Sequence, residues 1–403
     1  MRGADALVRT LEAAGISRIF ALSGNQIMPV FDAIFDSNIR LIHTRHEAAT
    51  VYMAEAHAQI SGGVGVALVT AGGGLGNAVG ALIAAQASDT PLLLLSGDSP
   101  VVSDGHGAFQ EVDQTNMTNG VTKASRRIMH VDEMVETVAW AIDLATSGRN
   151  GPVHLALPAD VLKDATSVLN IPAAQLIVEP ARLSELKALQ AADRPLIILG
   201  PAFTETRAPG LAAELRNTLN APVIAMESPR GLNDPALGHL SQVATEVDYV
   251  LCLGKPVDYT LRFGDSAQWP KVGQWDVVFG DESQLKATRA NLGLRLGSAT
   301  FDDPHAFAKG LTATGNPYPN RSKWINHVAT LCAARINASS DDGISPQDIC
   351  QVVQDQIDRM EKATLICDGG EFGQWAQAGL QAQKRIINGI SGVIGGGVGY
   401  AIG

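Results

Sequence analysis

The chain has 403 residues, of which 46% are hydrophobic and 18% are charged, and its formal net charge is −11 at pH 7. This length is enough for two or three domains of roughly 100–200 residues each, and the composition allows each domain a buried core. The negative charge argues against a nucleic-acid surface and against an anionic membrane as the partner.

The sequence shows no signal for export or membrane insertion. The first residues lack the continuous apolar run of a secretory signal. No segment reaches the about 18 apolar residues that a membrane span needs. The four cysteines form no C-x-x-C pair and are typical of reduced thiols in the cytosol. We therefore expect a cytoplasmic protein with no membrane partner and no nucleic-acid partner.

Strands and helices alternate over residues 1–165, which we predict to form the first domain. Helical spacing runs through ADALVRTLEAAG, PVFDAIFDS, the stretch from Glu47, NAVGALIAAQASD and MVETVAWAIDLATSG. The segments SRIFALSG, IRLIHTR, VGVALVTAGGG, PLLLLSGD and GPVHLALPAD are predicted strands. Several of these strands are continuously apolar, which indicates a parallel sheet covered by helices on both faces.

A linker at 166–183 leads to a second alternating unit at 184–312, with the apolar runs RPLIILGPA, APVIAMES, VDYVLCLG and WDVVFGD. After a second linker, rich in Pro, Asn and Gly, a third unit covers 340–403 and ends in GISGVIGGGVGYAIG. About 60 residues are too few for the doubly wound domain that this unit begins. The predicted fold is therefore α/β, with successive doubly wound parallel-sheet domains of which the third is incomplete.

A glycine-rich turn, TAGGGLGN at 70–77, lies between a predicted strand and a predicted helix. Such a turn lets a ligand approach the backbone and the first N–H groups of the helix. A dinucleotide fingerprint needs a third glycine where Asn77 stands, and Asp98 would then be its ribose ligand. Another ligand and a purely structural turn remain alternatives.

Isolated residues carry weaker signals. Glu47 lies on the first turn of a predicted helix, where the helix dipole stabilises any carboxylate. His46 precedes it without a second metal ligand at helical spacing and is predicted to be a polar helix-start residue. Lys255 and Arg262, in LGKPVDYTLRFG, either bind an anion or solvate the rim of the second domain. Val393 and Ile394 lie between glycines in GISGVIGGGVG, which is either a flexible tail or a tight turn that directs one side chain at another group.

Taken together, the motifs of the first unit point to one family. RHEAA, GVALVTAGGGLGNAV, PLLLLSGD, FQEVDQ and GPVHLALPADV occur in an order that resembles the N-terminal pyrimidine-binding domain of thiamine-diphosphate enzymes. TRHEAA and GVALVTAGGG are especially similar to acetolactate synthase and benzaldehyde lyase. By the same resemblance, 184–312 is the central domain and 340–403 is the start of the diphosphate-binding domain.

The resemblance implies roles for individual residues. Glu47 would lie beside N1′ of the cofactor's aminopyrimidine ring and activate the cofactor. Gln26 and Gln110 would contact the substrate, although benzaldehyde lyase and the pyruvate decarboxylases place a histidine near Gln26. A glutamine hydrogen-bonds a carbonyl but does not shuttle a proton near pH 7. The implied cofactor contacts are Thr70, Gly72, Gly73, Asn77 and, as the wedge that bends the cofactor, Ile394.

The implied chemistry is decarboxylation, carboligation or C–C bond cleavage on a 2-oxo acid or 2-hydroxyketone. In this family the two halves of the site come from different subunits, so a homodimer or homotetramer is expected. Mg²⁺ is bound there through a Gly-Asp-Gly motif and a later Asn, and neither lies within residues 1–403. We therefore expect no metal ligand in this sequence, weak or no cofactor binding and no activity by this chain alone, and both thiamine diphosphate and Mg²⁺ in the full-length parent.

Three questions stay open at this stage. FAD is present in the central domain of some acetolactate synthases, and the sequence does not exclude it here. The chain is alternatively a non-catalytic binding or regulatory protein that keeps the fold without the metal site. A nicotinamide-dependent dehydrogenase that uses GGGLGN and Asp98 is the remaining alternative.

Overall fold

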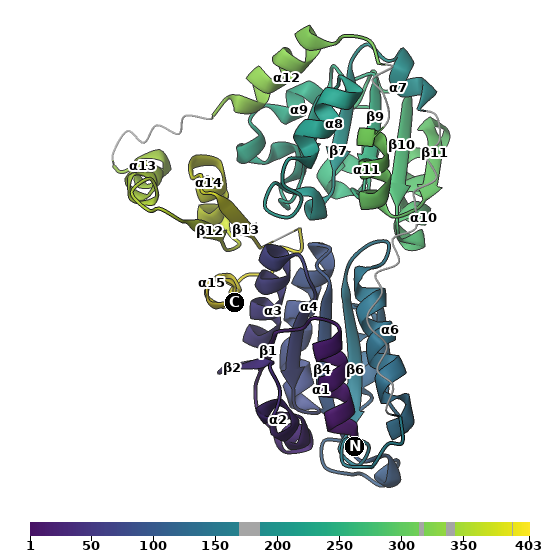
Figure 1. Cartoon of the computed structure of the whole chain (residues 1–403). Coiled ribbons are helices and arrows are strands. Elements are labelled where there is room, and N and C mark those ends of the chain that lie inside the picture. Colours follow the sequence, from purple (N-terminus) through teal and green to yellow (C-terminus); the bar gives the residue numbers. More distant parts are fainter. Residues whose placement is uncertain (169–185, 314–317, 336–342, 389) are drawn as a thin grey trace. The chain divides into compact units, whose positions relative to one another are not determined.

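The structure, a computed structural model, describes residues 1–168, 186–313, 318–335, 343–388 and 390–403 (Figure 1). The chain divides into two compact units, one of Met1–Ile177 with Gly395–Gly403 and one of Val178–Ile394. Most of the predicted linker at 166–183, and residues 340–342 of the predicted third domain, lie outside the described residues.

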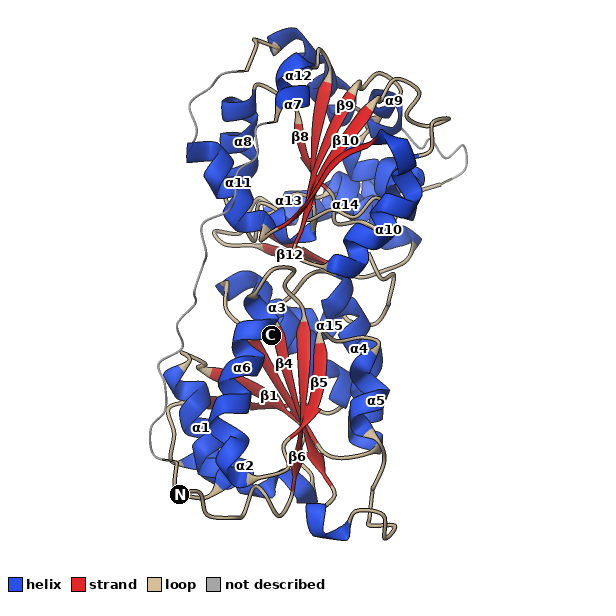
Figure 2. Cartoon of the chain, turned by 90° about the vertical axis from the view of Figure 1, so that its right-hand side faces the viewer, coloured by secondary structure: helices blue, strands red, loops and turns tan. Residues whose placement is uncertain are grey.

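The first unit is built on a parallel sheet with the strand order β2-β1-β3-β4-β6-β5. The strands are β1 (Arg18–Ala21), β2 (Arg40–His43), β3 (Gly65–Val69), β4 (Leu92–Asp98), β5 (Ala124–Arg127) and β6 (Pro152–Pro158). The helices are α1 (Gly3–Ala13), α2 (Met28–Phe35), α3 (Glu47–Ser61), α4 (Gly73–Ala87), α5 (Gln114–Asn119), α6 (Met134–Thr146) and α15 (Gly397–Ile402). Figure 2 shows α1 and α6 on one face of the sheet and α4 and α5 on the other.

The apolar strands lie where their composition predicts. Every residue of β3, β4 and β6 is buried, because helices cover both faces of these central strands. The prediction of an α/β fold with parallel sheets is confirmed. The sequence analysis missed β5 and α5, whose residues ASRR and QTNMTN are polar and give neither an apolar run nor helical spacing.

The second unit contains another parallel sheet, with the order β11-β10-β9-β7-β8. Its strands are β7 (Pro195–Leu199), β8 (Val223–Ala225), β9 (Tyr249–Leu253), β10 (Gln274–Phe279) and β11 (Leu296–Phe301). Its helices are α7 (Lys187–Ala191), α8 (Leu211–Leu219), α9 (Leu240–Ala244), α10 (Glu282–Leu292), α11 (Pro304–Ala313) and α12 (Ser322–Ala333). A small two-stranded sheet follows, formed by β12 (Thr364–Cys367) and β13 (Lys384–Ile387) with α13 (Pro346–Ile357) and α14 (Glu371–Gly379).

Short 3-10 helices lie at Asn25–Ile27, Val101–Ser103, Val131–Glu133, Pro201–Phe203, Gly231–Asn233, Pro235–Leu237, Tyr259–Gly264 and Gly293–Arg295. Within the described parts of the chain, no helix has both the length and the apolar character to cross a lipid bilayer.

The loop after β9 differs from its prediction. The Lys255 side chain is fully buried, and its ammonium group lies 3.3 Å from the carboxylate of Asp258. The prediction that Lys255 solvates a rim is therefore wrong, because a partner three residues along the chain allows the charge to be buried. Arg262 is exposed, as a rim residue should be.

Candidate active site

Glu47 is the first residue of α3. His46 caps the helix, because its Nδ1 accepts a hydrogen bond from the backbone N–H of Ala48 at 3.1 Å. The prediction of His46 as a polar helix-start residue is confirmed. The Glu47 carboxylate is half-buried, and its Oε2 accepts a hydrogen bond from Nδ2 of Asn77, on α4, at 3.0 Å. Two predicted site residues, 30 positions apart, are thus in direct contact.

The glycine-rich turn joins β3 to α4, and α4 begins at Gly73 rather than at the predicted Asn77. Gly72 has φ +60° and ψ −110°, a conformation that L-residues rarely adopt. A Cβ atom placed on Gly72 would lie 3.1 Å from Cβ of Gln110. A Cβ atom on Gly73 would meet no atom within 4 Å. The two glycines therefore differ in kind, since Gly72 fixes the turn and Gly73 leaves open space.

Gly74 brings the turn close to the carboxylate. A Cβ atom placed on it would lie 2.7 Å from Cγ2 of Thr70 and 3.6 Å from Oε1 of Glu47. Oε1 has no hydrogen-bond partner among the described residues, whereas Oε2 is held by Asn77. One carboxylate oxygen is therefore fixed and the other is free at the edge of the turn.

A chain of polar side chains runs beside the turn. Oγ1 of Thr70 donates to Oε1 of Gln26 at 2.7 Å, and Nε2 of Gln26 donates to Oε1 of Gln110 at 2.7 Å. Gln26 is 8% exposed, and Gly97 makes room for it, because a Cβ atom on Gly97 would lie 2.7 Å from its Cβ. Within the described part of the chain, the Nε2 group of Gln110 has no acceptor, so it is available to another carbonyl oxygen.

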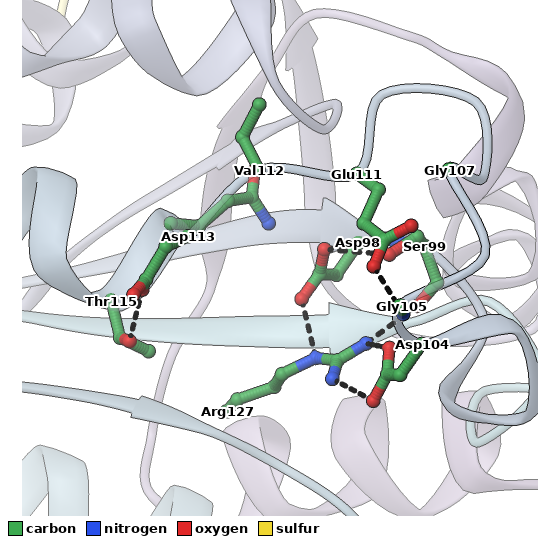
Figure 3. A pocket seen from close by; sticks show the side chains of 11 residues that line it. Asp98, Ser99, Asp104, Gly105, Gly107, Glu111, Val112, Asp113, Thr115 and Arg127 are labelled. Atoms are coloured by element: carbon green, nitrogen blue, oxygen red, sulfur yellow. Dashed lines mark hydrogen bonds and ion pairs between the residues drawn. The ribbon is translucent and has the colours of Figure 1, made fainter.

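The loop that carries Gln110 lines a cavity of about 590 Å³ (Figure 3). The lining consists mainly of polar and acidic residues: Asp98, Ser99, Asp104, Gly105, Gly107, Glu111, Val112, Asp113, Gln114, Thr115 and Arg127. Gln114 links this loop to the glycine turn, because its Oε1 accepts from the N–H of Gly72 and its Nε2 donates to the carbonyl of Gly97, both at 2.8 Å. Gln114 lies in the motif FQEVDQ, but nothing in the sequence shows that its side chain links these two segments.

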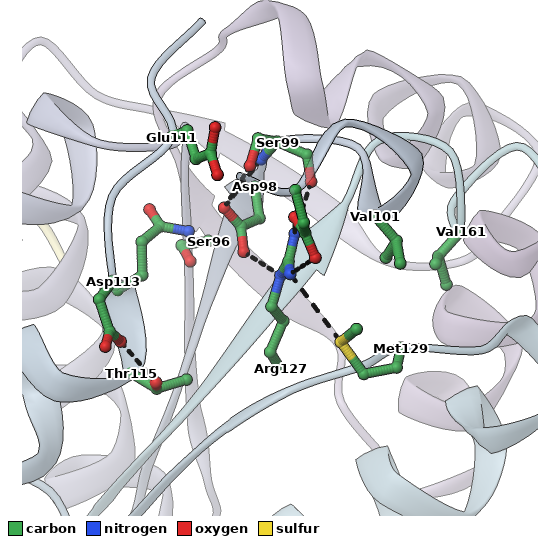
Figure 4. A network of polar contacts seen from close by, with 12 residues as sticks. Ser96, Asp98, Ser99, Val101, Glu111, Asp113, Thr115, Arg127, Met129 and Val161 are labelled. Atoms are coloured by element: carbon green, nitrogen blue, oxygen red, sulfur yellow. Dashed lines mark hydrogen bonds and ion pairs between the residues drawn. The ribbon is translucent and has the colours of Figure 1, made fainter. Parts of the chain in front are cut away.

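Asp98 is a structural residue in this arrangement. It is 3% exposed, and its carboxylate accepts from Nε of Arg127 at 2.6 Å and from the N–H of Ser99 at 2.8 Å (Figure 4). Burial raises the pKa of Asp98, while the Arg127 charge acts in the opposite direction. The hypothesis of Asp98 as a ribose ligand is therefore wrong, since both of its oxygens are engaged with the protein.

A buried carboxylate further along α3 anchors the helix that carries Glu47. Glu55 is 1% exposed; its Oε1 accepts from Oγ of Ser88 at 2.5 Å and from Nε2 of Gln59 at 3.1 Å. Its Oε2 accepts from the hydroxyl of Tyr400, on α15, at 2.9 Å. The ring of Tyr400 also contacts that of Tyr52 edge-on, with centroids 5.3 Å apart. Sequence reasoning missed Glu55, because nothing in the sequence shows that its partners converge on it.

Ile394 is the last residue of the second unit. Its side chain is 69% exposed, and Gly392 and Gly395 on either side have φ of +66° and +93°. A Cβ atom placed on Gly369, in the turn after β12, would lie 2.5 Å from Cγ2 of Ile394. Ile394 thus lies in a tight turn between glycines, and its side chain packs against Gly369.

Comparison with known proteins agrees with this geometry. Residues 1–117 match the family described as "Thiamine pyrophosphate enzyme, N-terminal TPP binding domain". A "Probable acetolactate synthase" of Mycobacterium bovis is 27% identical over 432 residues, which cover 100% of this chain and 75% of that protein. Residues 1–117 are therefore similar to the N-terminal domain of thiamine-diphosphate-dependent enzymes, and the rest of the chain aligns with an acetolactate synthase.

Further relatives match over shorter stretches. A "Probable acetolactate synthase large subunit" of Methanocaldococcus jannaschii is 34% identical over 50% of this chain and 36% of its own length. A "2-hydroxyacyl-CoA lyase 2" of Danio rerio is 40% identical over 40% of this chain and 26% of its own length. The chain thus spans about a third and about a quarter of these two relatives. These relatives do not support the FAD that the sequence left open.

The described residues suit one part of thiamine diphosphate. The free Oε1 of Glu47, close to Gly74 in the glycine turn, is a hydrogen-bond acceptor that can meet an aminopyrimidine ring. No group of three or more His, Cys, Asp or Glu among the described residues is arranged to hold a metal ion. The residues near Glu47 fit the pyrimidine side of thiamine diphosphate.

Proposed function

We propose that the protein containing this chain is a thiamine-diphosphate-dependent carboligase or carbon–carbon lyase acting on a 2-oxo acid or 2-hydroxyketone. The observation that carries the proposal is the Glu47 carboxylate, which Asn77 fixes through one oxygen and whose other oxygen is free, 3.6 Å from the position of a Cβ atom on Gly74. Bound thiamine diphosphate supplies the carbon nucleophile that cleaves or joins the substrate's carbon–carbon bond.

Glu47 has the task of exchanging a proton with the pyrimidine ring. Asn77 holds Oε2, so the carboxylate presents Oε1 in a defined direction. A positioned general acid–base group of this kind typically contributes about 10²–10⁴-fold to a rate.

Gln26 and Gln110 orient the substrate in this proposal. Neither side chain titrates near neutral pH, so both act as hydrogen-bond donors and acceptors only. Thr70 fixes the amide of Gln26, and Gln26 fixes the amide of Gln110. The Nε2 group of Gln110 then donates to the carbonyl oxygen of the substrate, while Glu47 carries the proton transfer.

The remaining assignments extend the same proposal. Residues 1–165 form the pyrimidine-binding domain, 184–312 the central domain and 340–403 the start of the diphosphate-binding domain. Thr70, Gly72, Gly73 and Asn77 contact the cofactor, and Ile394 supports its bent shape. We further propose a cytoplasmic homodimer or homotetramer whose Mg²⁺ ligands are not among the described residues.

Replacing Glu47 by Gln tests the proposal. Gln keeps an oxygen for Asn77 but has no carboxylate to exchange a proton, so the rate of C2-proton exchange in thiamine diphosphate with Mg²⁺, followed by proton NMR, should fall by about 10²-fold or more. Glu55→Gln, on the same helix, is the matched control and should lower stability without this selective loss. Unchanged exchange in Glu47→Gln with the cofactor bound would exclude the proposed role.

A further inference from the structure

We propose that Arg127 and Glu111 are positioning residues, which hold the loop 99–113 so that Gln110 keeps its orientation toward Gln26 and the substrate. The effect on substrate rests on the proposed function. The effect on the loop itself does not, since it concerns contacts within the free protein.

Arg127 ties the loop to the end of β4. Its guanidinium donates to both oxygens of Asp104, at 2.6 and 2.9 Å, in a two-point contact. The same group donates to the Asp98 carboxylate at 2.6 Å and to the carbonyl oxygen of Ser99 at 2.9 Å. Figure 3 shows the Arg127 side chain next to Asp98 and Asp104. One guanidinium therefore fixes a loop residue against the last residue of a buried central strand.

Glu111 closes the loop on its other side. Its Oε1 accepts from the N–H of Gly105 at 2.6 Å, and its Oε2 accepts from the N–H of Ala108 at 2.8 Å. These hydrogen bonds from backbone N–H groups lower the pKa of Glu111. The hydrogen bonds from the Arg127 side chain lower the pKa of Asp104. Both carboxylates are therefore charged at neutral pH, and both ties are charge-assisted.

Gln110 needs this support because of its backbone. Its φ is +61°, in the left-handed region that costs a non-glycine residue free energy. Such a conformation persists only where the surrounding structure determines it. Gly105 and Gly107 also have positive φ, so this part of the loop has little stiffness of its own. The ties at Asp104 and Glu111 lie on either side of these flexible positions.

The chain offers a matched ion pair at the other end of the strands. Nε of Arg149 lies 2.6 Å from Oδ1 of Asp89, with the side chains 19% and 8% exposed. Nε of Arg127 lies 2.6 Å from Oδ2 of Asp98, with the side chains 21% and 4% exposed. Asp89 precedes β4 and Arg149 precedes β6, whereas Asp98 ends β4. Loss of either arginine removes a similar ion pair, but only Arg127 contacts the loop.

Hydrogen–deuterium exchange of the cofactor-free protein tests the proposal. Arg127→Gln and Glu111→Gln should increase exchange at the amides of Gly105 and Ala108 on the order of 10- to 100-fold, as expected when a hydrogen bond to a charged group is lost. Arg149→Gln should leave exchange in 99–113 unchanged. If Arg127→Gln fails to fold, Glu111→Gln allows the same exchange measurement, because it removes the hydrogen bonds that Glu111 itself accepts from the loop.

The holoenzyme gives a second readout. Both loop variants should raise KM for the substrate by about tenfold, as for a lost substrate hydrogen bond, with kcat and the cofactor Kd less affected. Unchanged loop exchange in both variants, or an equal increase in Arg149→Gln, would overturn the proposal. Increased loop exchange in the two variants, together with no thiamine-dependent activity in the full-length wild-type protein, would support the positioning role and refute the proposed function instead.

Discussion

The adjacent glycines Gly72 and Gly73 should respond in opposite ways to the same substitution. At Gly72, φ +60° with ψ −110° is strained for any L-side chain, and the new Cβ would press on Gln110 at 3.1 Å. A strained backbone position of this kind costs about 1–3 kcal/mol, and the close contact adds to it. Gly72→Ala should therefore reduce the free energy of unfolding by roughly 2–3 kcal/mol.

Gly73→Ala should instead preserve or raise stability. Gly73 is the first residue of α4, has no positive φ and has open space where the methyl group would lie. Replacing a helical glycine with alanine stabilises by up to about 1 kcal/mol. If the cofactor lies along this turn, however, the methyl group should weaken thiamine-diphosphate binding by about tenfold or more, since it fills the space of the ligand rather than of the protein.

Urea denaturation of the two variants, followed by circular dichroism, measures the difference in stability. Isothermal titration with thiamine diphosphate and Mg²⁺ measures the difference in affinity. Equal stabilities of Gly72→Ala and Gly73→Ala would refute the assignment of backbone strain to Gly72. Normal cofactor affinity in Gly73→Ala would refute the assignment of the open space to the cofactor.

Two further predictions concern the frame of the site. His154 is fully buried between Ser96, Thr118 and Ser125, and burial lowers its pKa to about 3. In the unfolded chain His154 binds a proton near pH 6.5, whereas the folded protein keeps it neutral. The free energy of unfolding should therefore be unaffected by this histidine above pH 6.5 and should fall by about 1.4 kcal/mol per pH unit below it. Urea denaturation between pH 7 and 5 should show this dependence weakened in His154→Gln; identical slopes would contradict it. Tyr400→Phe removes a hydrogen-bond donor from the buried Glu55 and should lower the free energy of unfolding by about 1–3 kcal/mol. Tyr259→Phe removes an exposed hydroxyl that donates to the carbonyl of Ile390 and should lower it far less. Equal thermal shifts in the two tyrosine variants would count against an anchoring role for Glu55.

The sequence predicted the parts of the fold that apolar patterning controls. The continuously apolar runs at β3, β4 and β6 are buried central strands. It did not predict β5 or α5, because an edge strand and a short polar helix carry no such pattern. Those two elements supply Arg127 and Gln114, which brace the loop and the glycine turn.

The sequence did not indicate how the candidate site residues are connected by hydrogen bonds. Family motifs selected Gln26 and Gln110, yet nothing in the sequence indicates that side chains 84 positions apart share a hydrogen bond. Charge alone misled at Lys255 and Asp98, since it suggested exposure or ligand binding where each group has a protein partner. Such pairings depend on which distant residues the fold brings together, and the chemistry of a single residue does not show this.

The side chains of Thr70, Gln26 and Gln110 are linked by hydrogen bonds that involve no titrating group. None of the three side chains changes charge across the physiological range, so their geometry should be the same at pH 6 and at pH 9. Any pH optimum of catalysis must then originate outside these three side chains. Under the proposed role of Gln26 in substrate orientation, substitutions there should change substrate choice without moving the pH optimum. A histidine is the exception, because it would add a titrating group.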